Sequence, residues 1–139
     1  MHQRRVALTT IPAVPGHTLD AEHRALALFA PLRDLTTETA MFAYLDPKWR
    51  LLGLRTAPST CADMVEVPIR TIVGDALAFD AAGVVMAHNH PSGNPTPSGE
   101  DRALTRRLAR ALDGVAVRLV DHLVLAGSQT TSFRRIGLL

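Results

Sequence analysis

The stretch from Gly83 to Leu112 most constrains what this chain can fold into. Residues 83–87 are short and uniformly apolar, which is typical of a strand buried on both faces of a sheet. Residues 91–97 carry three prolines and a glycine, so we expect a stiff loop there. Residues 98–112 place leucines and alanines at helical spacing beside several arginines. A buried strand followed by a loop and an amphipathic helix predicts an α/β unit.

The rest of the chain predicts further helices and strands around this unit. We expect helices at 20–30 and 68–79, and strands at 39–45, 49–54, 115–119 and 122–125. Asp46-Pro47-Lys48 is a plausible hairpin turn, and residues 57–66 form a loop or an irregular strand. Residues 1–18 resemble a loose N-terminal leader ahead of one domain at 19–139. The order of elements predicts an α/β fold with a mixed β-sheet and flanking helices.

Composition narrows the function classes. A length of 139 residues suits one domain with a real core, and a net charge of +2 is too small to imply nucleic-acid binding by itself. Cys61 is the only cysteine, which excludes an intrachain disulfide and fits a reducing, cytoplasmic setting. No apolar run approaches the length of a membrane span, so we expect no membrane partner. The oligomeric state is not indicated.

The end of the predicted strand at 83–87 carries the motif His-x-His-x7-Ser-x2-Asp, made by His88, His90, Ser98 and Asp101. Side chains two residues apart in a strand share a face, so His88 and His90 converge while Asn89 points away and is free to hold a loop. Asp101 falls in the first turn of the next helix. Two imidazoles and one carboxylate with an open fourth position are typical of a catalytic zinc site.

Each part of this motif also has an ordinary structural explanation. Ser98 and Asp101 ahead of an apolar helix form a capping box, and that geometry would fix where Asp101 points. A pair of loop histidines is usually just solvated. The buried strand and the fixed spacing favour the metal interpretation, and the capping box is compatible with it.

A metal-dependent hydrolase needs a group that accepts and passes on a proton, and a glutamate outside the ligand set is the usual choice. The candidates are Glu22, Glu38, Glu66 and Glu100. Glu100 would point away if Asp101 points inward, whereas Glu38 lies just before the strand at 39–45. The Ser98 hydroxyl is placed to donate a hydrogen bond to an oxyanion, in addition to capping the helix.

These residues resemble the JAMM motif of the JAB1/MPN metalloprotease superfamily. One segment is similar to the RadC branch in particular: His88-Asn89-His90-Pro91-Ser92-Gly93, followed by Ser98 and Asp101. Further similarity covers most of the chain from about residue 20 to the end, in segments 34–46, 68–70, 121–124, 132–134 and 137–139.

The resemblance implies a three-layer JAB1/MPN α/β fold, akin to that of cytidine deaminases. It implies that His88, His90 and Asp101 bind Zn2+, that Glu38 is the general base and that Ser98 stabilises the oxyanion. Its substrates would be protein or peptide tails, including ubiquitin-like modifiers. The sequence departs from the family pattern at Thr71, near residues 55–57, and in lacking a helix-hairpin-helix-like segment ahead of the domain.

Three functions therefore compete. The first is a zinc-dependent metallohydrolase that cleaves amide or isopeptide bonds. The second is a RadC-type DNA-associated protein or nuclease, supported by the arginines at 102, 106, 107 and 110, although these also suit a solvated helix face. The third is a zinc-bound binding module without turnover. His122 is interpreted as a core histidine or as a support for a metal ligand.

Overall fold

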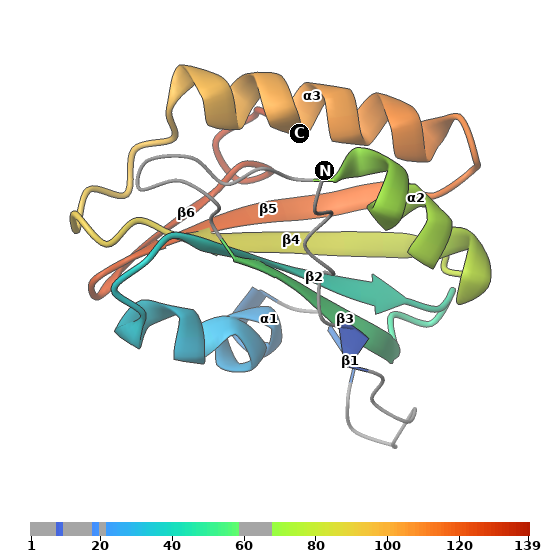
Figure 1. The fold of residues 1–139 in the computed structure, drawn as a ribbon, viewed down its shortest axis with the longest axis horizontal. Coiled ribbons are helices and arrows are strands. Elements are labelled where there is room, and N and C mark those ends of the chain that lie inside the picture. Colours follow the sequence, from blue (N-terminus) through green and yellow to red (C-terminus); the bar gives the residue numbers. More distant parts are fainter. Residues whose placement is uncertain (1–7, 10–17, 20–21, 59–67) are drawn as a thin grey trace, which may run out of the picture.

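The computed structural model describes residues 8–9, 18–19, 22–58 and 68–139. Within these ranges the chain forms a six-stranded mixed sheet in the order β1-β3-β2-β4-β5-β6, with helices on both faces (Figure 1). Cys61 and Glu66 lie outside the described residues. The elements are β1 (Leu8–Thr9), α1 (Glu22–Phe29), the 3-10 helix η1 (Ala30–Asp34), β2 (Thr39–Leu45), β3 (Leu51–Pro58), α2 (Ile69–Ala78), β4 (Gly83–Asn89), α3 (Gly99–Asp113), β5 (Arg118–Ala126) and β6 (Gln129–Ser132).

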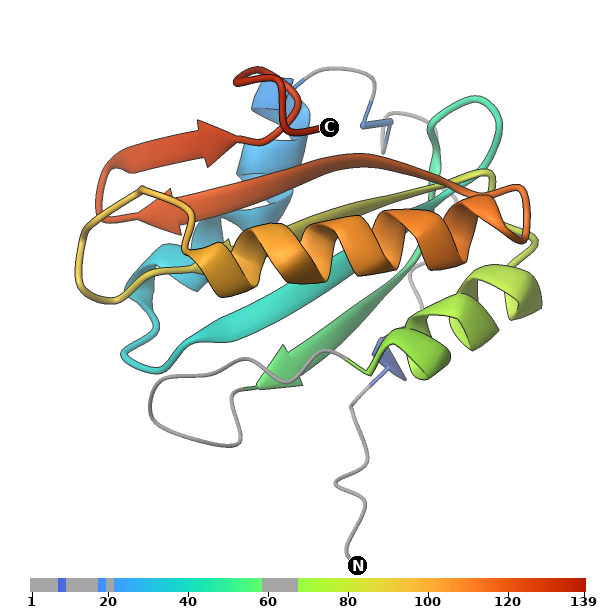
Figure 2. The same cartoon turned by 90° about the horizontal axis from the view of Figure 1, so that it is seen from above.

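Strand β4 is the centre of the sheet, and all seven of its residues are buried. It pairs antiparallel with β2 on one side and parallel with β5 on the other. A parallel neighbour requires a crossover connection, and α3 provides it by lying across the sheet between β4 and β5 (Figure 2). The amino end of α3 therefore lies near the carboxyl end of β4, where an α/β sheet commonly carries its site.

Apolar side chains fill both faces of the sheet, which gives three layers. On the face covered by α2 and α3, the core includes Phe42, Met86 and Leu108. On the opposite face, covered by α1, it includes Phe29 and Leu45. Figure 1 shows α2 and α3 on one side of the sheet and α1 on the other. The three-layer α/β fold expected from the sequence is confirmed.

The hairpin between β2 and β3 is confirmed, but β3 starts later than predicted. The Asp46 carboxylate accepts hydrogen bonds from the backbone N–H groups of Lys48 and Arg50, both through Oδ1. Trp49 has a φ of 62°, a left-handed conformation that cannot continue a strand. The strand predicted at 49–54 consequently begins at Leu51.

The strand residues predicted at 118–119 and 122–125 are confirmed, but they belong to one continuous strand, β5. The predicted break between two strands is wrong, and residues 115–117 precede β5 instead of forming part of it. Asp121 interrupts the apolar pattern without ending the strand. Its carboxylate accepts hydrogen bonds from the His122 N–H and the Ser132 hydroxyl, so its polar group is satisfied within the sheet.

Two short edge strands complete the sheet. Strand β6 follows a tight turn at Gly127, whose φ is 57°, and pairs antiparallel with β5. Residues Leu8–Thr9 form β1 and pair with β3, although the sequence suggested a loose leader there. Across the described ranges, we find no helix that has both the length and the apolar character needed to cross a membrane.

Candidate metal centre

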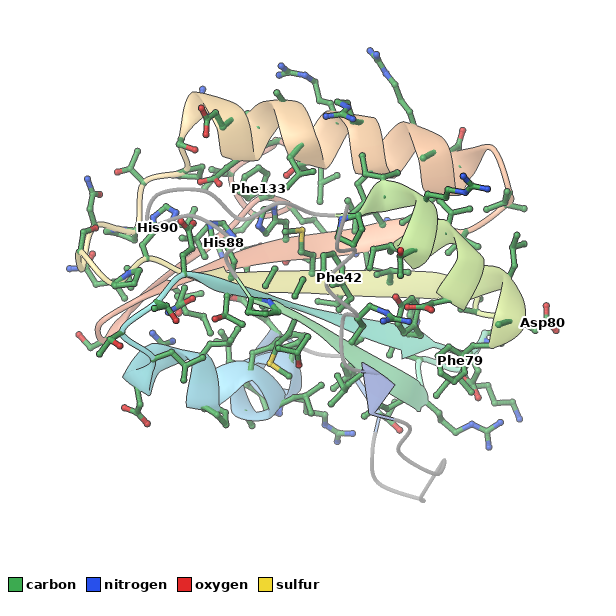
Figure 3. All side chains as sticks on the ribbon, in the orientation of Figure 1. Phe42, Phe79, Asp80, His88, His90 and Phe133 are labelled. Carbon is green, nitrogen blue, oxygen red and sulfur yellow. The ribbon has the colours of Figure 1, made fainter. Side chains whose placement is uncertain are left out.

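The carboxyl end of β4 brings the two predicted imidazoles together. The backbone N–H of His90 donates to the Leu125 carbonyl at 2.8 Å, so the extended geometry continues past the end of the strand. His88 and His90 therefore share a face, and their Nε2 atoms lie 2.8 Å apart. Figure 3 shows both rings at this end of the sheet, below the start of α3. The predicted convergence of the two histidines is observed.

The predicted capping box at the start of α3 is confirmed. The Ser98 hydroxyl oxygen accepts a hydrogen bond from the Asp101 N–H at 3.0 Å, and Asp101 Oδ2 accepts one from the Ser98 N–H at 2.8 Å. The same Asp101 carboxylate faces the histidines. Its Oδ1 lies 3.4 Å from His88 Nε2, and its Oδ2 lies 3.2 Å from His90 Nε2. The cap thus aims Asp101 at the imidazole pair.

Glu38 completes the group. Its Oε1 lies 3.6 Å from His88 Nε2 and 3.8 Å from His90 Nε2. Ligand atoms of Glu38, His88, His90 and Asp101 all lie within 4.8 Å of one another, an arrangement able to hold a metal ion. Of the glutamates that the sequence offered as proton acceptors, Glu22 and Glu100 lie outside this group, and Glu66 lies outside the described residues.

Asn89 holds the segment that carries Glu38. Its side chain points to the face opposite His88, as predicted, and is 2% exposed as a residue. Its Oδ1 accepts a hydrogen bond from the Thr39 N–H at 2.7 Å, and its Nδ2 donates to the carbonyls of Leu35 and Thr37 at 3.2 and 3.0 Å. One strand end thus presents two imidazoles on one side and anchors Glu38 from the other.

We expect Asn89→Ala to destabilise the metal-free protein by about 1–3 kcal/mol, because it removes the hydrogen bonds of the Asn89 side chain to the Thr39 N–H and to the carbonyls of Leu35 and Thr37. The measurement is urea unfolding. Asn94→Ala is the matched control, since Asn94 is an exposed asparagine in the loop that follows. Equal unfolding midpoints for the two variants would contradict an anchoring role for Asn89.

Burial and hydrogen bonds shift the pKa values of His90, Asp101 and His122. The hydrogen bond to Asp101 raises the pKa of His90, although burial opposes the change. Burial raises the pKa of Asp101, but the neighbouring imidazoles of His88 and His90 outweigh this and hold the pKa well below its ordinary value. Burial, reinforced by the nearby His88, lowers the pKa of His122 well below its ordinary value. His122 is therefore neutral in the folded protein.

The metal-free protein is expected to be most stable near pH 6.5, the ordinary histidine pKa. Above pH 6.5 the unfolded chain has released the His90 proton, whereas the folded protein keeps it up to the raised pKa. The stabilisation from protonated His90 is therefore lost as the pH rises through that raised pKa. Below pH 6.5 the free energy of unfolding falls, because His122 takes up a proton in the unfolded chain but stays neutral in the folded protein. Thermal melts of chelator-treated protein across roughly pH 5 to 9 test this. A melting temperature that rises steadily with pH would contradict it.

The donor set fits a zinc ion. His90 Nδ1 lies 2.8 Å from the Asn94 carbonyl, which can only accept, so Nδ1 carries a proton and Nε2 is the nitrogen available to a bound ion. Tetrahedral zinc with bonds of roughly 2.0–2.1 Å places its ligand atoms about 3.3 Å apart. Asp101 Oδ1 lies 3.4 Å from His88 Nε2 and Asp101 Oδ2 lies 3.2 Å from His90 Nε2, so each oxygen is near that spacing from one imidazole. The two imidazoles, 2.8 Å apart, would separate slightly.

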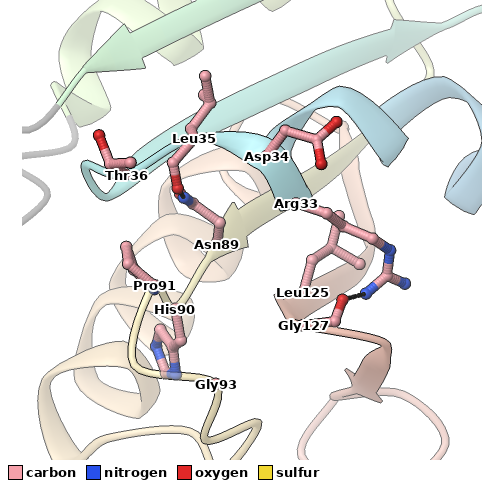
Figure 4. Close-up of a pocket in the computed structure, with 10 residues that line it drawn as sticks. All are labelled: Arg33, Asp34, Leu35, Thr36, Asn89, His90, Pro91, Gly93, Leu125 and Gly127. Carbon is pink, nitrogen blue, oxygen red and sulfur yellow. Dashed lines mark hydrogen bonds between the residues drawn. The ribbon is translucent and has the colours of Figure 1, made fainter.

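A pocket of about 360 Å³ borders the cluster at His90 (Figure 4). It lies between η1, the end of β4 and the turn after β5. Arg33 closes one side by donating hydrogen bonds to the carbonyls of Gly127 and Gln129. The pocket is lined by Arg33, Asp34, Leu35, Thr36, Asn89, His90, Pro91, Gly93, Leu125 and Gly127.

Comparison with known proteins places this arrangement in a family. Residues 19–138 match the sequence model of the RadC-like JAB domain. The chain belongs to this family. All four residues of the cluster lie inside the matched range, so the RadC-like JAB domain of this chain contains the whole candidate metal centre.

Several curated bacterial proteins are similar to this RadC-like JAB domain. The UPF0758 protein YfjY of Escherichia coli (strain K12) is 43% identical over 105 residues, which cover 76% of this chain and 66% of YfjY. The UPF0758 protein YeeS of the same organism is 40% identical over 112 residues, covering 81% and 76%. A UPF0758 protein of Thiobacillus denitrificans is 41% identical, with 76% of this chain matching 47% of that protein. The chain thus spans about half to three quarters of these relatives.

Two buried residues, His122 and Thr105, lie next to the cluster. The sequence left the role of His122 open between two interpretations and did not predict a role for Thr105. His122 lies against His88, with Nε2 2.6 Å from Nδ1 of that ligand candidate, so it is more than a core histidine. Thr105 contacts His122 and was not singled out. The available signal was its position, because a threonine on the buried stripe of an amphipathic helix needs a polar partner.

Proposed function

We propose that this domain is a zinc-dependent hydrolase of the JAMM type that cleaves amide or isopeptide bonds in a protein or peptide substrate. The observation that supports it most is the position of Glu38. Its carboxylate lies 3.6 and 3.8 Å from the two imidazole nitrogens, next to a set of two histidines and one aspartate that leaves a tetrahedral ion one free position.

The chemistry follows from the arrangement. When bound, zinc supplies Lewis acidity, polarising the scissile carbonyl and lowering the pKa of a coordinated water to about 7. Glu38 accepts the proton of the attacking water as the C–O bond forms and gives the tetrahedral oxyanion. It then delivers this proton to the amine, so that the carbonyl re-forms as the C–N bond breaks. The Glu38 side chain is 17% exposed, which keeps it reachable while limiting its hydration.

Ser98 is proposed to stabilise the oxyanion. Its hydroxyl oxygen already accepts the Asp101 N–H, but its own proton is not used by that bond. Ser98 is exposed, so this proton can be donated to a substrate oxygen.

Ser98→Ala is expected to lower kcat about 10²–10³-fold through the lost oxyanion donor, and to cost about 1 kcal/mol of stability through the lost cap. Ser98→Thr keeps both the acceptor and the donor and should retain most of the activity. Steady-state kinetics and urea unfolding separate the two effects. An alanine variant that loses stability but keeps its kcat would limit Ser98 to capping.

The substrate class is proposed from the site. The pocket beside His90 has room for part of a polypeptide tail, and its lining combines apolar Leu35 and Leu125 with polar groups. We propose a protein tail or a ubiquitin-like modifier joined through an isopeptide bond. This setting would be cytoplasmic, where such substrates occur.

The decisive experiment incubates zinc-loaded protein with a library of fluorogenic peptides and of isopeptide-linked modifiers. Cleavage that a chelator stops and added zinc restores is the expected result. Zinc binding without cleavage of any substrate would instead favour a metal-stabilised binding module. Failure to bind zinc or any other divalent ion would overturn the proposal.

A second candidate, a DNA-associated or nuclease function, is favoured by one surface. Arg102, Arg106 and Arg110 follow one another at four-residue spacing along α3, with Arg107 beside them, and all four are exposed. Binding to duplex DNA that weakens steeply with salt, and is reduced in Arg106→Ala/Arg107→Ala, would support it.

A further inference from the structure

His122 lies buried between a metal-ligand candidate and helix α3. It comes from β5, is 0% exposed, and places Nε2 2.6 Å from His88 Nδ1. Its Nδ1 lies 2.7 Å from the hydroxyl oxygen of Thr105 on α3. Its ring stacks on Phe133, with centroids 4.4 Å apart and planes at 17°. This packing fixes the plane of the ring, and within the part of the chain that the structure describes its two nitrogens contact His88 and Thr105.

The Thr105 hydroxyl sets the direction of the hydrogen bonds. Its oxygen is 2.7 Å from the Asp101 carbonyl, which has no proton, so the hydroxyl donates there. A hydroxyl has a single proton, and the 2.7 Å contact with His122 Nδ1 is then a hydrogen bond only if His122 donates. A neutral imidazole with its proton on Nδ1 has a lone pair on Nε2, which accepts from His88 Nδ1.

We propose that Thr105 and His122 are positioning residues that hold His88 in the tautomer with its proton on Nδ1 and its Nε2 lone pair directed into the cluster. The inference rests on the proposed metal centre and adds a role for two residues outside the ligand set. His90 reaches the same state through the Asn94 carbonyl. Both imidazoles thereby direct Nε2 into the cluster, and these two nitrogens lie 2.8 Å apart.

The arrangement also couples two ligand candidates through one helix. Asp101 contributes its carboxylate to the cluster, and its carbonyl accepts the Thr105 hydroxyl one turn later in α3. The orientation of this first turn therefore sets both the Asp101 carboxylate and, through Thr105 and His122, the tautomer of His88. Metal affinity should depend on a threonine that does not touch the ion.

The tautomers can be observed directly in the metal-free protein. Long-range proton–nitrogen NMR correlations of the histidine rings, recorded at roughly pH 8 where free imidazoles are neutral, distinguish a proton on Nδ1 from one on Nε2. We expect Nδ1 protonation for both His88 and His122. A spectrum with the His88 proton on Nε2 would overturn the proposal, and this measurement needs no variant.

Thr105→Val and Thr105→Ser form the matched pair for zinc affinity. Valine has the shape of threonine but cannot accept from His122, so we expect the His122 proton to move to Nε2 and the His88 proton to move to its own Nε2. Zinc affinity, measured by chelator competition, should fall about 10- to 100-fold, whereas Thr105→Ser should stay close to the unaltered protein. The hydrogen bonds from His88 through His122 to Thr105 form a relay that fixes the His88 tautomer. Equal affinities and unchanged tautomers in the two variants would refute this relay.

A second pair covers the case in which Thr105→Val fails to fold. His122→Gln retains an oxygen able to accept from His88, and His122→Leu removes the acceptor, so only the leucine variant should lose zinc affinity. Equal losses in both would count against the relay. These readouts are independent of catalysis: a protein that binds zinc with the expected tautomers but cleaves nothing would refute the hydrolase and leave the relay standing.

Discussion

A Glu38→Gln protein is expected to bind zinc as tightly as the unaltered chain and to turn over substrate about 10²–10⁴-fold more slowly. Glutamine keeps the size of the side chain and an oxygen near His88 and His90, but it cannot accept the proton of the attacking water. The measurement combines kcat with zinc content and with zinc affinity from chelator competition.

Zinc affinity distinguishes the two roles open to this carboxylate, since its oxygen lies within 4.8 Å of the other three ligand atoms. A Glu38→Gln protein that loses zinc would make Glu38 a fourth ligand instead of a base. One that cleaves as fast as the unaltered chain would exclude both roles. Glu100→Gln provides the control, because Glu100 is exposed, adjacent to Asp101 and outside the cluster.

Asp101→Asn is expected to lower zinc affinity by more than the roughly 10- to 100-fold that follows loss of a supporting partner. The amide retains an oxygen that can accept the Ser98 N–H, so much of the helix cap survives. What disappears is the negative charge that faces both imidazoles at 3.4 and 3.2 Å. Activity should fall in proportion to the zinc that remains bound.

Calorimetric titration of zinc into metal-free protein gives the affinity, and the metal-free melting temperature reports the cap. Asp113→Asn, an exposed change at the other end of α3, should alter neither. If Asp101→Asn binds zinc normally, Asp101 serves the cap alone and the ligand set must be redrawn around Glu38.

Much of the site could be predicted because its signals are local. Strand alternation places His88 and His90 on one face and Asn89 on the other, and the capping pattern fixes Asp101 at the start of α3. Glu38 was different: the residues left four glutamates open, and the family resemblance pointed to this one. Its position depends on Asn89 binding the backbone around Thr39, a contact between distant segments that no local pattern encodes.

The errors also have physical causes. Asp121 falls in the gap between the two predicted strands, and its hydrogen bond from the Ser132 hydroxyl comes from a later segment. Thr105 looked like an ordinary residue of a helix, since nothing near it in the sequence indicates that it meets a histidine from β5. Side-chain hydrogen bonds between remote elements were the part of this structure that sequence patterns could not supply.

The loop between β4 and α3 has a consequence for the entropy of metal binding. Pro91, Pro95 and Pro97 restrict the backbone even in the unfolded chain, and the Pro95 carbonyl is held by the Thr131 hydroxyl at 2.7 Å. Little conformational freedom is therefore left to lose when an ion binds. Small zinc modules fold only when the metal arrives, whereas this domain has apolar cores on both faces of its sheet. We expect a chelator to remove the ion and leave the fold in place, ready to be reloaded.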